Sequence, residues 1–472
     1  MPARLASLIV AASLGLAACG GEAAPPTDGT SPPGDGGNGG DGEGLIFWSA
    51  EDNAERIQAT QAIIDRFVDE TGIEVELVAI AEGDLATQVT AAVAGDTLPD
   101  VFGALSLGFT HGLAADGLAD VEANAAVVDA LGRETFSEAA LDLVGTADGV
   151  AGVPSDSWAQ LLVYRTDLFE EAGLEPPTTF DTIREAAETL NTGDQAGIVL
   201  GTGGPEPGFV QQTFEYFAVA NGCDVVDDSG NVTIGSPECV ETFQFYTDLV
   251  NASVEGAQDP DTTRAAYFAG DAAMIVWSSF LLDELAGLRD DALPTCPECE
   301  EDPLFLAENS GVVTAIQGPS GDEPSQFGEV VSFVISDTAQ TEDAQRFVEF
   351  MMSDGYVDWL ALAPEGKFPT RLGTADNPTE YADAWGELEA GVDRKQPLGE
   401  IYDAETIEAL TTSSETMKRW AFTQGQGALA GALVTEVPVP TALGLALEGA
   451  VSPEEAAQEA QAAIEEILGA LE

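Results

Sequence analysis

The sequence predicts an α/β protein whose body divides into two lobes. Short apolar strands alternate with amphipathic helices along most of the chain, and strand–helix–strand repetition implies parallel pairing with right-handed crossovers. About 430 residues follow the N-terminal segments, which exceeds what one hydrophobic core comfortably holds. Hydrophobic residues make up 44% of the 472, which is enough to fill two cores.

The N-terminus carries the pattern of a secretory signal peptide at residues 1–18. Arg4 supplies a positive charge, and the apolar run from Leu5 to Ala18 is too short to span a bilayer, which takes ~20 residues. A short transmembrane anchor is the alternative. Because no later segment is long and apolar enough to cross a membrane, we expect the rest of the chain to be soluble.

A lipid-anchoring motif follows the apolar run. Residues 16–20 read L-A-A-C-G and resemble the lipobox of bacterial lipoproteins, in which the cysteine, here Cys19, is acylated and begins the mature protein. A signal peptide with an accidental cysteine is the alternative. Residues 19–44 are rich in Gly, Pro, Asp, Ser and Thr, so they predict a flexible linker between the lipid and the folded body.

The charge balance is extreme and excludes several partners. The chain has 84 acidic and 15 basic residues, giving a net charge of −69. Such a surface repels nucleic acid and anionic membranes, so we expect no nucleic-acid binding and membrane contact only through the lipid anchor. Self-repulsion destabilises a compact state and salt screens it. Our hypothesis is therefore a source that lives in elevated salt.

Four further cysteines predict disulfides. Cys223, Cys239, Cys296 and Cys299 are an even number in an exported chain, which favours bridges, and they allow three pairings. We favour Cys223–Cys239, which brackets a predicted hairpin at 225–234, and Cys296–Cys299, which closes a small loop. The alternative is a metal or redox site. A lone C-x-x-C with no nearby histidine is poor evidence for zinc, so we predict no metal.

Predicted elements of the first lobe alternate without long gaps. Strands are expected at 45–48, 73–80 and 100–102, with helices at 52–70 and about 83–94 between them.

The alternation returns in the second half. Ser236-Pro237 places an N-cap and a first-turn proline before a helix, and a capping box at 452–455 opens the C-terminal helix to about 468. The remaining predicted elements are an extended segment at 153–164, a helix at 179–190, strands at 198–200, 273–277 and 330–335, and a helix over 344–351.

Four segments in consistent order resemble the extracellular solute-binding proteins of ABC importers, specifically the maltose-binding-protein-like group (family 1). They are residues 45–102, ending in "LPDVF"; 149–177, "GVAGVPSDSWAQLLVYRTDLFEEAGLEPP"; 268–280, "FAGDAAMIVWSSF"; and 330–371, with a "G-x-x-P-x-R" turn. The resemblance covers the chain from about residue 45 to the C-terminus.

This resemblance implies a periplasmic-binding-protein-like clamp with a hinge and discontinuous lobes. Lobe 1 would comprise 45–155 plus about 312–365, and lobe 2 about 156–311 plus 366–472. A small molecule, expected to be a mono- or oligosaccharide, would bind in the cleft, and the importer's membrane subunits would recognise the closed form. We expect an extracytoplasmic monomer without a cofactor.

Sugars present hydroxyl edges and apolar faces, so their binders need aromatic rings and oxygen acceptors. Trp48 ends the first predicted strand, and Glu51 and Asp52 follow it, at the sheet edge where ligands bind in open α/β sheets. Family position suggests Glu51 and Asp52 as hydroxyl acceptors, with helix capping the alternative for both. Ser106 follows the third strand in an equivalent place.

Three more aromatic residues stand where the family contacts ligand. Trp158 lies in the segment that crosses between lobes, with Asp156 and Gln160 as weaker neighbours. Trp277 and Phe280 follow the "AAM" strand, where the family commonly places a stacking ring. Core packing is the alternative for each ring.

Two late candidates and two in a Gly/Pro-rich stretch complete the set. Phe209 and Gln212 could line the second lobe, and Phe368 and Arg371 belong to the "G-x-x-P-x-R" turn. Because basic residues are scarce, pairing with a carboxylate is the alternative for Arg371.

Enzymes form the main rival class. The chain has one histidine, His111, and lacks H-E-x-x-H, G-x-S-x-G and P-loop motifs. The 84 acids leave carboxylate-pair glycosidase chemistry open but single out no pair. A second rival keeps the clamp and changes the ligand to a polyamine or another small solute. A structural adhesin would show repeats, and none is visible.

Overall fold

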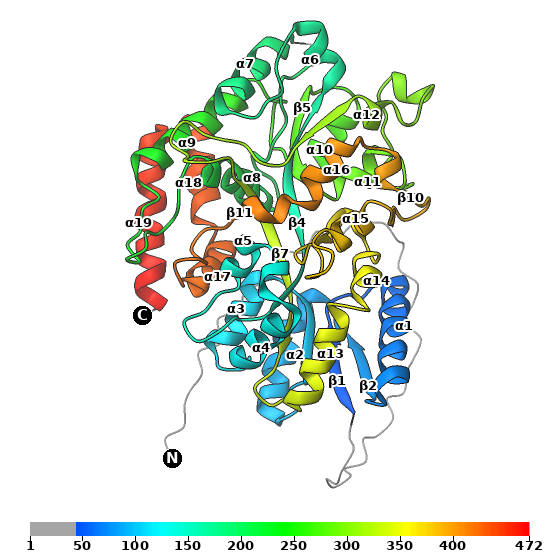
Figure 1. Cartoon of the computed structure of the whole chain (residues 1–472). Helices are drawn as coiled ribbons and strands as arrows, with labels where there is room; N and C mark the ends of the chain where they lie inside the picture. Colours follow the sequence, from blue (N-terminus) through cyan, green and yellow to red (C-terminus); the bar gives the residue numbers. More distant parts are fainter. Residues whose placement is uncertain (1–43, 194, 472) are drawn as a thin grey trace, which may run out of the picture.

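The computed structural model describes residues 44–193 and 195–471 (Figure 1). The predicted signal peptide, the lipidation site Cys19 and nearly all of the predicted linker therefore lie outside the described residues.

The first α/β unit has the predicted alternation. It consists of β1 (Leu45–Ser49), α1 (Ala54–Thr71), β2 (Val75–Ala79), α2 (Glu82–Gly95) and β3 (Val101–Leu105). β1 pairs in parallel with both β2 and β3, which confirms the parallel pairing expected here. Local interactions define both ends of α1. The Asn53 side chain accepts a hydrogen bond from the N–H of Glu55 at the start, and Gly72 ends the helix at φ 72°.

Two strands carry the chain between the lobes. β4 (Val153–Arg165) pairs antiparallel with β7 (Gln326–Ile335) along its first half. Along its second half β4 pairs with β5 (Met274–Ser278) and β6 (Ser310–Val313). β7 also pairs antiparallel with β3. One sheet of the described residues, in the order β2-β1-β3-β7-β4-β5, thus extends from one lobe into the other.

Strand direction in the second lobe differs from the parallel pattern expected. β4 enters from the first lobe and meets β5 and β6 antiparallel, because the crossing strand, not a βα unit, forms this part of the sheet. The strand predicted at 198–200 is reduced to isolated parallel bridges, Ile198 with Ser253 and Val199 with Ile275.

Helices cover the sheet of each lobe (Figure 1). Around β1–β3 and β7 lie α3 (Leu107–Ala115), α4 (Val121–Leu131), α5 (Glu138–Leu143), α13 (Thr341–Met351) and α14 (Tyr356–Leu360). Around β5 and β6 lie α6 (Thr166–Ala172), α7 (Phe180–Leu190), α8 (Pro207–Ala220), α9 (Pro237–Val250), α10 (Pro260–Phe268), α11 (Leu281–Leu285) and α12 (Phe305–Glu308).

The C-terminal region returns along both lobes. It contains β8 (Phe368–Pro369), α15 (Glu380–Trp385), β9 (Glu389–Ala390), β10 (Gln396–Pro397), α16 (Ala404–Thr411), β11 (Met417–Lys418), α17 (Gly427–Glu436), α18 (Pro438–Leu447) and α19 (Pro453–Leu471). β8 pairs with β4 and β11 with β7, so this region is tied to both crossing strands. α17 packs against α3, while α18 and α19 pack against α9 (Figure 1).

Both favoured disulfides are present. Cys223 is bonded to Cys239 at the start of α9, and Cys296 is bonded to Cys299. The hairpin expected inside the first bridge is a tight turn, closed by the isolated pair Val226–Val232.

Most apolar side chains form one extensive core through both lobes. A smaller cluster lies under α2 and α3, with Leu85, Phe102 and Leu105 at its centre. Within the described residues, no single helix has the length and apolarity to cross a membrane. The bent pair α17–α18 meets that test by length and composition only.

Candidate functional site

Three aromatic rings meet where the chain crosses between the lobes. The ring of Trp158 on β4 lies 6.4 Å from that of Phe280, which follows β5, and 5.9 Å from that of Phe327 on β7. Trp158 and Phe280 are only partly buried. The structure therefore brings together two of the predicted ring residues and adds Phe327.

Strand alternation places polar side chains on the same face. Alternate residues of a strand point to one side, so Trp158 and Gln160 share a face of β4. Ser278 lies opposite Gln160 in the β4–β5 register, and Glu329 lies opposite Trp158 in the β4–β7 register. We call this surface, comprising Trp158, Gln160, Ser278, Phe280, Phe327 and Glu329, the crossover face.

Neutral polar atoms at this face are buried without partners. Among the described residues, nothing bonds the side-chain amide of Gln160 or the hydroxyl of Ser278. The hydroxyls of Ser157 and Ser279 and Oε1 of Gln211 on α8 are also buried without a partner, but they are not part of the crossover face. An unsatisfied buried polar group costs ~1–3 kcal/mol, so these atoms are poised to accept a bonding partner.

Arg419 provides the charged part of the site. Its Nε donates to Oε1 of Glu215 on α8 at 3.1 Å, and its Nη1 donates to Oε2 of Glu329. The guanidinium lies over the ring of Phe327, 4.4 Å from its centroid. Burial opposes the charge of Arg419, but the two carboxylates outweigh it and raise the arginine's pKa. Burial raises the pKa of Glu215 despite Arg419.

A tight turn after β11 presents Arg419. Trp420 donates its backbone N–H to Glu215 and its indole N–H to the carbonyl of Cys223, beside the first disulfide. Ala421 takes the left-handed backbone conformation, φ 69°, and its N–H donates to Asp224. Burial raises the pKa of Asp224 to about 6. The turn is thus anchored to the second lobe.

Helix α3 of the first lobe contacts the crossover face through Glu329. The backbone N–H of Leu107, the first residue of α3, donates to Oε1 of Glu329 at 2.6 Å. Ser106 precedes it as the N-cap and makes no side-chain capping bond. The structure therefore places predicted Ser106 beside the crossover face.

Glu51 belongs to a buried ionic network next to this face. Its carboxylate contacts Nζ of Lys367 at 2.7 Å and Nη1 of Arg56 at 2.9 Å. Burial alone would raise the pKa of Glu51, but Lys367 and Arg56 outweigh it and hold that pKa at about 2. Lys367 also pairs with Asp156, which accepts from the indole N–H of Trp359 at 2.7 Å. These charges are already paired.

The other two residues predicted from this segment are Trp48, within β1, and Asp52, after it. Trp48 packs against Phe102, with ring centroids 5.8 Å apart, beside the smaller hydrophobic cluster. Asp52 is exposed, and its neighbour Asn53, not Asp52, caps α1.

Trp277 and Phe209 are buried in the core, whereas Gln212 is half-buried. Trp277 is only 4% exposed, its indole N–H donates to the carbonyl of Pro260, and Arg264 covers its ring. Trp277 belongs to β5 and its side chain is buried in the core, whereas Phe280 lies beyond the strand, at the N-cap of α11, with its ring near that of Trp158. Phe209 is buried in the core at the start of α8, and Gln212 is half-buried on the same helix.

The late turn also serves the fold. Phe368 is fully buried against Trp385, with ring centroids 5.2 Å apart. Arg371 donates to the backbone carbonyls of Leu131 and Met352, so carbonyls and not a carboxylate satisfy it. Burial lowers the pKa of Arg371. We leave Trp48, Asp52, Phe209, Gln212, Trp277, Phe368 and Arg371 out of the proposed ligand contacts.

Sequence reasoning missed Glu329 and Arg419. Glu329 comes directly before the predicted strand at 330–335, but its position opposite Trp158 depends on strand register. Arg419 carries no motif signal. The one sequence feature that could have drawn attention to Arg419 is that basic residues are scarce, with only 15 in the chain.

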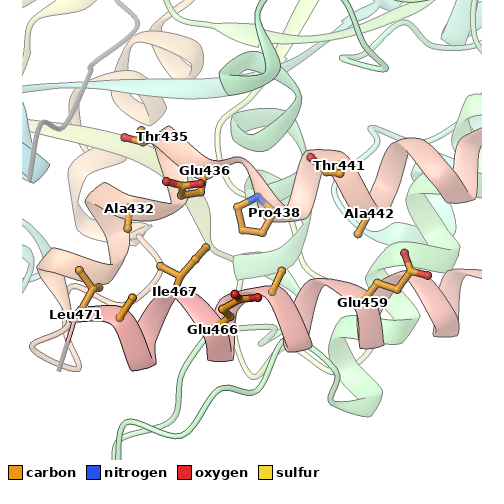
Figure 2. A pocket seen from close by; sticks show the side chains of 12 residues that line it. Ala432, Thr435, Glu436, Pro438, Thr441, Ala442, Glu459, Glu466, Ile467 and Leu471 are labelled. Atoms are coloured by element: carbon orange, nitrogen blue, oxygen red, sulfur yellow. The ribbon is translucent and has the colours of Figure 1, made fainter.

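A groove of about 830 Å³ lies elsewhere, between the C-terminal helices (Figure 2). Ala432, Glu436 and Pro438 form one wall, and Glu466 and Ile467 of α19 face them. Its lining has no aromatic ring and no side-chain amide. The described residues contain no group of three His, Cys, Asp or Glu side chains that could hold a metal.

These features define a two-lobe, periplasmic-binding-protein-like clamp whose lobes are discontinuous in sequence. The family model for bacterial extracellular solute-binding proteins matches residues 51–358, so the chain belongs to that family. A putative ABC transporter periplasmic-binding protein of Escherichia coli K12, YcjN, is 27% identical over 379 residues, covering 78% of this chain and 82% of YcjN.

Solved structures share the fold at low identity. The cyclic α-maltosyl-1,6-maltose binding protein of Arthrobacter globiformis has a TM-score of 0.69 at 19% identity, covering 90% of this chain and 99% of that one. A cyclo/maltodextrin-binding protein complexed with maltotetraose has 0.67 at 15%, covering 92% and 99%. A sugar transporter protein of Arthrobacter chlorophenolicus with bound laminaribiose has 0.62 at 16%, covering 90% and 99%.

Proposed function

We propose that this protein captures a neutral carbohydrate outside the cytoplasm and delivers it to the membrane subunits of an ABC importer. A lipid on Cys19 would hold it at the cell membrane. It would act as a monomer, without catalysis and without a cofactor.

The observation that carries the carbohydrate proposal is the composition of the crossover face. The rings of Trp158 and Phe280 offer apolar surfaces for the C–H faces of a sugar. The unbonded amide of Gln160 and the hydroxyl of Ser278 offer neutral donors and acceptors for its hydroxyls. Three of the solved relatives with this fold are named for maltose-type sugars or carry laminaribiose.

The position of the face suggests how binding would be coupled to closure. β4 and β7 are the strands by which the chain crosses between lobes, and Glu329 on β7 bonds α3 of the first lobe. A ligand held against both lobes would shift the population toward the closed form. That form is what membrane subunits would recognise.

A polyamine fits the face less well than a sugar. Polyamines need free carboxylates, and three carboxylates at or beside the face are occupied: Glu215 and Glu329 by Arg419, and Glu51 by Arg56 and Lys367. The same pairing makes these three carboxylates poor general acids for a glycoside hydrolase, because a general acid must carry a transferable proton. Incubation with labelled oligosaccharides should therefore give binding without cleavage.

A thermal-shift screen tests the ligand class. Mono- and oligosaccharides, amino acids and polyamines would be compared on the folded body, followed by calorimetry on the hits. We expect a neutral sugar to raise the melting temperature. Stabilisation by polyamines alone would refute the carbohydrate proposal.

Anchoring needs a separate test with the full chain. We expect the protein, expressed in a bacterium that acylates lipoproteins, to enter the detergent phase on Triton X-114 partitioning. Cys19→Ser should move it to the aqueous phase, whereas the neighbouring Ser13→Ala should not. Detergent partitioning of Cys19→Ser equal to that of the parent would contradict lipidation at this residue.

A further inference from the structure

The guanidinium of Arg419 has a donor left over after its ion pairs are made. Nε and Nη1 are used by Glu215, Glu329 and the carbonyl of Gly328. No described residue accepts a hydrogen bond from Nη2, although the side chain is only 9% exposed. Nη2 is not one of the fully buried side-chain atoms that lack a partner, so solvent reaches it. A donor that no protein group uses and that solvent reaches is one that a ligand can satisfy.

This donor belongs to the crossover face. The ring of Phe327 lies between the two groups concerned, 4.4 Å from the guanidinium of Arg419 and 5.9 Å from the ring of Trp158. A sugar stacked on Trp158 would therefore lie near Arg419, and the ring of Phe327 contacts both side chains.

The carboxylates of Glu215 and Glu329 together outweigh the positive charge of Arg419. Glu215 accepts from Arg419 and from the N–H of Trp420 at 3.0 Å, and Glu329 accepts from Arg419 and from the N–H of Leu107. One guanidinium against two carboxylates leaves a local formal charge of −1. A hydroxyl oxygen can accept from Nη2 in this setting, while a ligand carboxylate or phosphate would be repelled.

The other basic groups beside the face are occupied in the same way. Lys367 is shared by Glu51 and Asp156, and Arg56 is paired with Glu51. Each of these cations is therefore charge-balanced within the protein, and none is left to attract an anion.

We propose that Arg419 is a specificity-determining residue that donates from Nη2 to a hydroxyl oxygen of a neutral sugar, while Glu215 and Glu329 make the site reject sugar acids. This inference rests on the proposed function and adds the charge class of the ligand. It assigns Glu215 and Glu329 as positioning residues for Arg419.

Matched sugar pairs provide the test. Glucose and glucuronate, and galactose and galacturonate, would be titrated calorimetrically into the full-length protein. The wild-type protein should bind the neutral member of a pair at least tenfold more tightly. Glu329→Gln and Glu215→Gln each remove one carboxylate and should shift that preference at least tenfold toward the acid. Glu323→Gln, an exposed change of equal charge beside Lys418, should not.

Arg419→Gln should weaken binding of the neutral sugar at least tenfold, and circular dichroism and melting curves would establish that each variant folds. If either carboxylate variant unfolds, the other carries the test. A preference unchanged in the folded carboxylate variants, or a wild-type preference for the acids, would overturn the inference while leaving sugar capture intact. If no sugar in any pair or in the wider screen binds the wild type, the proposed function itself falls.

Discussion

Glu329 on β7 lies directly opposite Trp158 on β4 in the register of the two crossing strands. This places the Trp158 ring next to the Glu329–Arg419 ion pair of the candidate site. Glu329 also bonds the first turn of α3 and Arg419. Strands from both lobes thus set the spacing between an aromatic surface and a charged donor. Any change in lobe orientation would act on that spacing.

Removing the Trp158 ring should weaken ligand binding with little loss of stability. The ring is partly exposed, so truncation leaves a smaller cavity than at a core site. Stacking on an aromatic face contributes ~0.5–1.5 kcal/mol beyond buried area, so we expect Trp158→Ala to lower sugar affinity by a factor of roughly 2 to 10. Trp158→Phe should recover most of it. Calorimetry decides this, and an unchanged Kd in Trp158→Ala would place the ligand elsewhere.

Asp283 should make stability fall as pH rises. Its side chain is 0% exposed and, among the described residues, neither carboxylate oxygen has a partner. Burial, then the charges of Glu365 and Glu284, raise its pKa to about 8, against the opposing charge of Arg289. The folded state therefore holds this proton more tightly than the unfolded state. The stabilisation is complete below the unfolded pKa of about 4 and is lost as pH rises through about 8.

Urea unfolding between pH 5 and pH 9 measures this effect. Asp283→Asn cannot ionise, so it should flatten the decline in unfolding free energy seen in the wild type. Asp271→Asn, at an exposed position, should keep the wild-type slope. A slope in Asp283→Asn as steep as in the wild type would show that other groups are responsible.

The two disulfides should contribute unequally to stability. Cys223–Cys239 spans a sequence separation of 16 and Cys296–Cys299 one of 3. Loop-closure entropy then predicts about 3 kcal/mol for the longer loop and roughly 1.5 kcal/mol for the shorter. Double Cys→Ser variants would be compared by urea unfolding. The longer bridge also borders the carbonyl that Trp420 bonds, so its loss should weaken ligand binding as well. Equal losses from the two pairs would contradict the entropic account.

Salt should stabilise the folded body. The net charge of −69 is repulsive, and the Debye length falls from about 10 Å at 0.1 M to about 3 Å at 1 M. We expect the melting temperature to rise steadily from low salt to 1 M NaCl. Sucrose at equal osmolality serves as the uncharged control for water activity. A melting temperature independent of salt would remove the basis for a saline habitat.

Prediction from sequence succeeded where the determining interactions are local. The β1–α1–β2–α2–β3 alternation follows from hydrophobic periodicity and from ends such as Asn53 and Gly72. Trp158 and Phe280 could be nominated as ligand contacts because they stand at recognisable places in short segments, and their role in binding stays a prediction. Trp277 was nominated together with Phe280, but the structure buries its side chain in the core. Which face of a strand is buried depends on what packs against it, and the local sequence does not show this.

The sequence by itself determined the family, the two-lobe class, the extreme acidity and the residue set from which bridges could form. These depend on composition and on neighbours along the chain. Only the tertiary structure decided that Glu329 faces Trp158, that Arg419 lies between Glu215 and Glu329, and that Arg371 bonds carbonyls. These contacts join residues about 90 to 240 positions apart, and their free energy depends on burial and strand register, which no local pattern encodes.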